Sequence, residues 1–175
     1  GFNHRRPPFD DLRVRQAFAL AIDRERLADK VLGGRVVAAS GTIVPPGMPG
    51  HTAGIGLAYD PGQARRLLAE SGYLEGRGFP TIEIYAGVRP AMEVIPHVRG
   101  QWLENLGVEV NWTAIPWEVF KERLPNLQVE MWFIGWTADY PDPHTFLWES
   151  NWTKQAGWQN ETFEQLIEEA RGLMD

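Results

Sequence analysis

The sequence contains no cysteine among its 175 residues. Disulfides, thiol nucleophiles and cysteine-based zinc sites are therefore excluded, although the cellular compartment stays open. No apolar run reaches about 18 residues, so we expect no membrane-spanning helix. Residues 1–8 lack the apolar segment of a signal peptide. A mature product or a fragment would lack it as well, so this absence does not indicate the compartment. The 17 basic residues are outnumbered by 23 acidic ones, which argues against a general nucleic-acid binder because such proteins need a basic surface.

The composition is otherwise that of a soluble globular protein, except for its tryptophan content. Hydrophobic residues make up 43% and charged residues 23% of a chain long enough for one domain with a core. Six of its eight tryptophans fall between positions 112 and 152. Core packing is the favoured interpretation for Trp112 and Trp132, which lie on predicted strands. The alternative interpretation is an aromatic wall around a ligand.

Apolar periodicity predicts a chain of mixed helices and strands. Helices are predicted at 11–32, 61–71, 91–106, 117–124, 144–149 and 161–173, and strands at 81–86, 108–115 and 129–136. Asp10 or Asp11 is the predicted N-cap of the first helix and Asp60 that of the second, and Asp23 is predicted to start a second turn or a bent continuation within 11–32. The inner stripe of the helix at 91–106 is predicted to include Leu103, and that of the helix at 161–173 is predicted to include Leu166. Residues 33–59 contain seven Gly and three Pro. This segment is too long for a turn and too apolar for a disordered linker, so we expect an ordered irregular loop.

Strands and helices alternate between residues 81 and 136, as in a β-α-β-α-β unit. Such units form parallel sheets with right-handed crossovers. In open sheets of this kind, ligands bind beyond the carboxyl ends of the strands. This rule selects the loops at 87–90, 115–117 and 136–142, of which only the third contains carboxylates.

Five short segments, in this order, resemble one known family. They are FDDLRVRQA at 9–17, AIDR at 21–24, PPGM at 45–48, YDPGQA at 59–64 and GWTADYPDP at 135–143. Together they resemble the oligopeptide-, dipeptide- and nickel-binding proteins of ABC importers, which form family 5 of the bacterial extracellular solute-binding proteins.

The resemblance implies an α/β fold: a three-layer, type II periplasmic-binding-protein-like lobe with a β-α-β-α-β core and flanking helices. Residues 1–175 would be a single domain, the second (C-terminal-side) lobe of a two-lobe protein, with the first lobe absent. The implied function is capture of a peptide or similar small polar solute outside the cytoplasm for an ABC permease. The implied partners are that solute, the first lobe and the permease. No enzymatic activity and no cofactor are expected.

The resemblance also implies ligand-binding residues on the loop at 136–142. The aspartate at the position of Asp139 would pair with the positively charged α-amino group of a peptide. Alternatively, Asp139 only caps its own turn. Trp136 would line the pocket or pack in the core, and Tyr140 is a weaker candidate wall residue. Asp142 is instead predicted to cap the following helix. The remaining candidate ligand-binding residues are Arg89, Trp117, Thr137 and Ala138.

Two other kinds of site were weighed on the same loop. Asp139, Asp142 and His144 provide too few oxygen ligands for a hard cation, so no metal site is expected. Asp139, Asp142 and Glu149, with the aromatic residues, leave open a carbohydrate-binding or glycoside-hydrolysing module, since glycosidases use paired carboxylates. No residue shows a motif for acyl transfer, and no catalytic residue is predicted for the main hypothesis.

Overall fold

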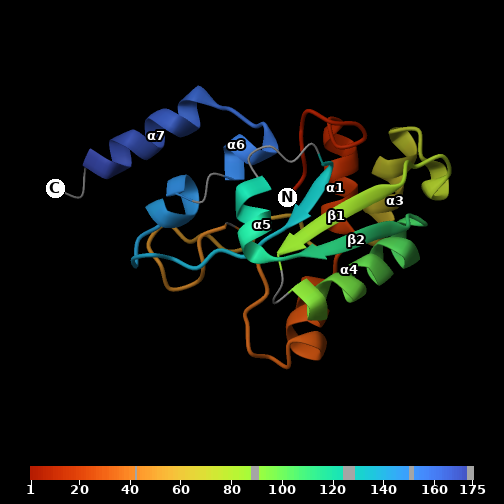
Figure 1. The fold of residues 1–175 in the computed structure, drawn as a ribbon, viewed down its shortest axis with the longest axis horizontal. Helices are drawn as coiled ribbons and strands as arrows, with labels where there is room; N and C mark the ends of the chain where they lie inside the picture. Colours follow the sequence, from red (N-terminus) through yellow and green to blue (C-terminus); the bar gives the residue numbers. More distant parts are fainter. Residues whose placement is uncertain (42, 88–90, 124–128, 150–151, 173–175) are drawn as a thin grey trace.

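The computed structural model describes residues 1–41, 43–87, 91–123, 129–149 and 152–172 (Figure 1). Within these residues three parallel strands form a sheet in the order β2-β1-β3. The strands are β1 (Ile82–Gly87), β2 (Val110–Ile115) and β3 (Met131–Phe133). Helix α4 (Ala91–Leu106) connects β1 to β2, and α5 (Trp117–Arg123) precedes β3. The predicted parallel β-α-β-α-β unit is therefore confirmed.

The remaining elements precede and follow this unit. Before it lie α1 (Leu12–Leu20), α2 (Arg24–Arg26), the π-helical turn η1 (Leu27–Val31), α3 (Pro61–Glu70) and the 3-10 turn η2 (Leu74–Gly76). After it lie the π-helical turn η4 (Thr145–Glu149), α6 (Trp152–Ala156) and α7 (Glu161–Gly172). Figure 1 shows α7 projecting away from the sheet, at the opposite end from α3. Among the described residues, no helix combines the length and apolarity that a membrane crossing requires.

The two faces of the sheet pack against different helices, because successive side chains of a strand point to opposite faces. Ile82 and Ile84 of β1 join a core cluster with residues of α1, α3 and α4, such as Phe18. Tyr85 points to the other face, where it packs against a smaller cluster that contains Trp132 and Phe120 of α5. Helices therefore cover both faces, which gives three layers.

The first residues of the chain cover the outer edge of β3. The amide of Trp132 donates to the carbonyl of Gly1 (3.1 Å), and the amide of Asn3 donates to the carbonyl of Glu130 (2.9 Å). Phe2 forms an antiparallel bridge with Met131. An uncovered strand edge would present unpaired backbone groups, so this contact between distant parts of the chain completes the sheet.

The segment at 33–59 contains neither helix nor strand in its described part, which excludes residue 42. Backbone hydrogen bonds cross it, as from the amide of Gly56 to the carbonyl of Ser40 (3.2 Å). Gly41 is needed here, since a Cβ at this position would lie 2.1 Å from the carbonyl oxygen of Thr52. Val44 is buried. These contacts fit an irregular loop that packs on the domain.

Several predicted elements differ from the observed ones. The helix predicted at 11–32 is divided after Leu20, and the second turn predicted at Asp23 is observed, because the carboxylate of Asp23 accepts a hydrogen bond from the amide of Arg26 (2.8 Å) and caps α2. The strand predicted at 129–136 is limited to β3, the part that pairs with β1. Helix α6 was not predicted.

Two leucines predicted to face the core are exposed. Leu103 of α4 is 55% exposed and Leu166 of α7 is 57% exposed. Each residue of an α-helix is rotated by about 100° from the one before it. The face of α4 that packs against the core contains the polar residue Asn105, and Leu103 lies on the outer face. Asn105 is accommodated because its Nδ2 donates to the carbonyl of Ala21 (2.9 Å). The pattern of apolar residues in the sequence could not show that a polar residue is buried and an apolar one exposed.

Candidate functional site

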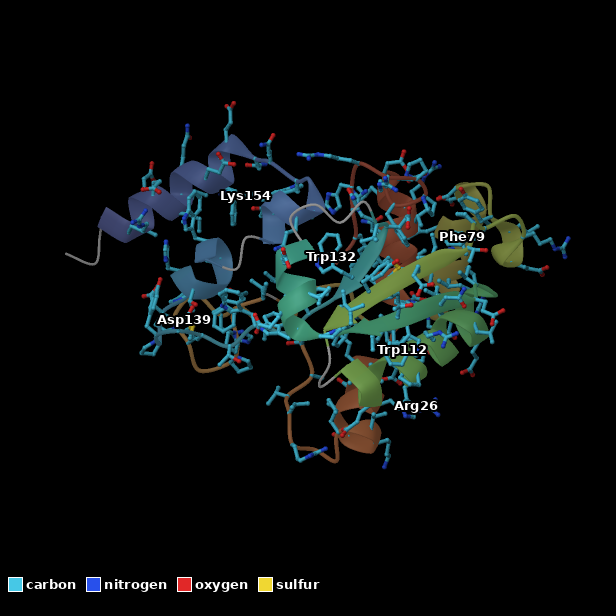
Figure 2. The ribbon with its side chains drawn as sticks, in the orientation of Figure 1. Arg26, Phe79, Trp112, Trp132, Asp139 and Lys154 are labelled. Atoms are coloured by element: carbon cyan, nitrogen blue, oxygen red, sulfur yellow. The ribbon has the colours of Figure 1, made fainter. Side chains whose placement is uncertain are left out.

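The candidate site lies on the segment that leaves β3 at its carboxyl end and leads to η4. Phe133 is the last residue of the strand. Figure 2 shows Asp139 on this segment, away from Trp132, which lies within the sheet. The carboxyl ends of β1 and β2 are Gly87 and Ile115. The structure therefore places Asp139 on a connection at the edge where ligands bind in open parallel sheets.

The hydroxyl of Thr145 holds this segment in place. Thr145 is fully buried, with 0% exposure. Its Oγ1 accepts a hydrogen bond from the indole Nε1 of Trp136 (3.2 Å) and a longer one from the backbone amide of Asp139 (3.4 Å). Trp136 and Asp139, two predicted ligand residues, are thus tied to the same atom.

A compact turn follows Asp139. The carboxylate of Asp142 accepts from the amide of His144 (2.8 Å), just before η4, the helical segment that Asp142 was predicted to cap. The carbonyl of Pro143 accepts from the amide of Leu147 (3.0 Å). The hydroxyl of Tyr140 lies 2.7 Å from Nδ1 of His144, with the two rings nearly parallel. The turn is therefore fixed by its own hydrogen bonds.

The Asp139 side chain itself is on the surface. Asp139 is exposed, and its backbone amide is the group that bonds Thr145. Among the described residues, no hydrogen bond or ion pair engages its carboxylate, including one to its own backbone. An exposed carboxylate on a fixed backbone can accept a charge-assisted hydrogen bond from a cationic ligand group.

Two hollows border the segment. The larger, about 850 Å³, lies between the turn and α7, with Tyr140 and His144 on one side and Glu168 and Arg171 on the other. The smaller, about 380 Å³, is lined by Gly1, Ile43, Ile134, Trp136 and Phe146. Asp139, Thr137, Ala138 and Trp117 line neither of these two hollows. Of the predicted ligand residues, Tyr140 lines the larger of these two hollows and Trp136 the smaller.

The other predicted residues have different surroundings. Trp117 begins α5 just after β2, is 43% exposed and stacks on Phe120 at 5.8 Å. Thr137 is exposed and Ala138 is half-buried. Arg89 lies outside the described residues. Thr145 was not predicted, because a threonine near the start of a short helix has no sequence signal that distinguishes a structural hydroxyl from a solvated one.

The other kinds of site weighed on this loop are a metal site and a glycosidase-type carboxylate pair. No group of three or more His, Asp or Glu among them is arranged to hold a metal ion. The side chain of Glu149, one of the carboxylates in the glycosidase alternative, lies outside the described part. The geometry of a carboxylate pair with Glu149 therefore stays a prediction.

Known proteins resemble this chain over most of its length. The family model described as bacterial extracellular solute-binding proteins, family 5 middle, matches residues 1–158. A probable di/tripeptide-binding protein 5 of Pseudomonas aeruginosa is 34% identical over 153 residues, which cover 83% of this chain and 27% of the relative. Heme-binding protein A of Haemophilus influenzae is 30% identical over 184 residues, covering 98% of this chain and 33% of the relative.

A solved structure extends the likeness to the fold. The dipeptide-binding protein of Pseudoalteromonas sp. SM9913, in complex with Met-Leu, matches with a TM-score of 0.77 and 32% identity. The match covers 95% of this chain and 34% of that protein. The chain thus spans about a quarter to a third of the length of these relatives, which are 27% to 34% covered.

Proposed function

The chain belongs to family 5 of the bacterial extracellular solute-binding proteins, and from this premise we propose that it is the ligand-binding second lobe of an ABC importer's binding protein. Its fold is the type II periplasmic-binding-protein fold of its structural relatives. The proposed ligand is a short peptide or a similar small polar solute. The observation that carries this proposal is the likeness to a dipeptide-bound protein over 95% of the chain.

Asp139 is the proposed contact for the ligand's α-amino group. Its carboxylate is exposed and has no described partner, while its backbone is held by Thr145. Closure of two lobes by a hinge movement would remove water from the site. A charge-assisted hydrogen bond between carboxylate and ammonium is stronger there than at an open surface. Trp136 and Tyr140 flank Asp139 and would contact the rest of the ligand.

The proposed partners and location come from the family. The missing lobe would supply the opposite wall of the site, and an ABC permease would receive the closed, loaded protein. The protein would work outside the cytoplasm. The named relatives are binding proteins rather than enzymes and bring no support to the carbohydrate alternative.

A peptide with and without a free amino group tests the role of Asp139 in the full-length protein. We expect Asp139→Asn to weaken Met-Leu binding about 10- to 100-fold, since a hydrogen bond to a charged group contributes roughly 1.5–3 kcal/mol. The wild type should lose a similar factor with N-acetyl-Met-Leu. The two changes should not add, because each removes the same contact. Isothermal titration calorimetry measures all four affinities.

An unchanged Met-Leu affinity in Asp139→Asn would rule out the amino-group contact. The ligand class is tested separately by thermal shift of the full-length protein with dipeptides, tripeptides, haem, nickel and cello-oligosaccharides. A shift with a sugar alone would contradict peptide capture and support the alternative.

A further inference from the structure

Thr145 is a fully buried polar side chain of the candidate site, and the proposed function gives it no part in ligand affinity. We propose that Thr145 is a positioning residue for ligand capture. Its hydroxyl holds the Trp136 indole and the Asp139 backbone in the arrangement that presents the Asp139 carboxylate to a ligand's amino group. This inference rests on the proposed function, because it gives Thr145 its effect through Asp139 and Trp136.

The geometry makes the hydroxyl the shared acceptor. Nε1 of Trp136 lies 3.2 Å and the amide nitrogen of Asp139 lies 3.4 Å from Oγ1 of Thr145. A hydroxyl oxygen has two lone pairs, so it can accept both bonds at once. An indole N–H can only donate, and so can a backbone amide N–H. The pair of bonds therefore requires an acceptor at position 145, and no aliphatic side chain can replace it.

Thr145 is itself held firmly. It is fully buried, and its amide donates to the carbonyl of Asp142 (3.2 Å). Just beyond it, the amides of Phe146 and Leu147 both donate to the carbonyl of Pro143 (3.0 Å each). Thr145 thus belongs to a turn fixed by backbone hydrogen bonds, whereas Asp139 is exposed. Fixing a binding residue in advance reduces the ordering cost that association would otherwise include.

Two substitutions at position 145 separate the hydroxyl from the shape of the side chain. Thr145→Val keeps the branched shape and removes the acceptor, while Thr145→Ser keeps the acceptor. In the full-length protein we expect Thr145→Val to weaken Met-Leu binding about tenfold and Thr145→Ser to stay within about twofold of wild type, the loss corresponding to one to two hydrogen bonds. N-acetyl-Met-Leu should show a much smaller loss.

A spectroscopic signal reports the positioning without a ligand. With ¹⁵N-labelled tryptophan, the indole resonance of Trp136, assigned through Trp136→Phe, should move in Thr145→Val and stay near its wild-type position in Thr145→Ser. Val14→Ala, a core change in α1 at a residue with 0% exposure, is the control for loss of stability. It should lower the melting temperature and leave both the indole signal and the affinity unchanged.

The outcomes distinguish this inference from the proposed function. Unchanged affinity in Thr145→Val, while Asp139→Asn binds weakly, would overturn the inference and keep the Asp139 contact. Equal losses of affinity in Thr145→Val and Val14→Ala would show a merely structural role and also overturn it. If Asp139→Asn binds as wild type, the amino-group contact fails. The indole signal then still decides whether Thr145 positions Trp136.

Discussion

Trp102 and Trp117 carry the same side chain in opposite surroundings. Trp102 of α4 is 4% exposed, and its Nε1 donates to the carbonyl of Phe18 (2.9 Å). Trp117 is 43% exposed and stacks on Phe120 at the surface. A buried polar group costs free energy unless it is paired. Trp102 is therefore a buried core residue whose N–H is paired, whereas Trp117 lies partly in solvent.

Trp102→Phe should lower the free energy of unfolding by about 1–3 kcal/mol, because the carbonyl of Phe18 loses its buried donor. Trp117→Phe, the matched control, should change it by less than about 0.5 kcal/mol, as surface substitutions usually do. Urea denaturation followed by circular dichroism measures both. Equal losses in the two variants would show that the buried hydrogen bond contributes nothing.

Helix starts are the elements that local sequence specified best. Asp11, Asp23 and Asp60 each accept a hydrogen bond at 2.8 Å from an amide two or three residues ahead, at the first turns of α1, α2 and α3. Such caps depend only on neighbouring residues. The caps at α1 and α3 were predicted for this reason. Lengths and exposed faces depend on distant partners, so β3 and the outer side of α4 differed from the predictions.

The cap of α1 should make stability depend on pH. Hydrogen bonds from the Arg13 side chain are the main reason that the pKa of Asp11 is lowered. A lowered folded-state pKa gives a contribution that is fully present above the pKa of the unfolded chain, about 3.9 for Asp, and is lost as pH falls through the folded value. The wild type should therefore exceed Asp11→Asn in stability at pH 7, and the gap should close in strong acid.

Asparagine caps helices about as well as aspartate, so this comparison isolates the charge. Thermal unfolding at a series of pH values measures the gap. In an Arg13→Gln background, the gap between the Asp11 protein and Asp11→Asn should shrink, because only the smaller contributions from the backbone amide of residue 13 and from Arg15 remain. An undiminished gap there, or one that widens as pH falls, would show that another group is responsible.

Across the whole chain, the described core is packed on both faces of the sheet, whereas Asp139 in the candidate site is exposed. Helices cover both faces of the sheet, and residues 1–3 pair with β3, about 130 positions away along the chain. By contrast, Asp139 lies on an exposed segment, and the neighbouring hollows border it without enclosing it. We therefore expect the core to support folding by itself and the proposed site to provide one wall for a ligand.

The 175-residue chain alone should therefore fold but bind peptide poorly. We expect a single cooperative unfolding transition, because the helices on both faces pack against one sheet. We expect Met-Leu affinity at least about 100-fold below that of the full-length protein, because lobe closure and the opposite wall are lost; this corresponds to roughly 2.7 kcal/mol. Calorimetry on both proteins compares the affinities. Equal affinities would contradict the proposed two-lobe capture.

The sequence by itself determined the β-α-β-α-β order, the aspartate caps and the carboxylate-bearing loop at the carboxyl end of the third strand. These features follow from local periodicity and from neighbours a few positions apart. Only the tertiary structure decided that residues 1–3 cover β3, that Leu103 is exposed, and that the hydroxyl of Thr145 bonds both Trp136 and Asp139. Each of those depends on which groups the folded chain brings within hydrogen-bonding or packing distance.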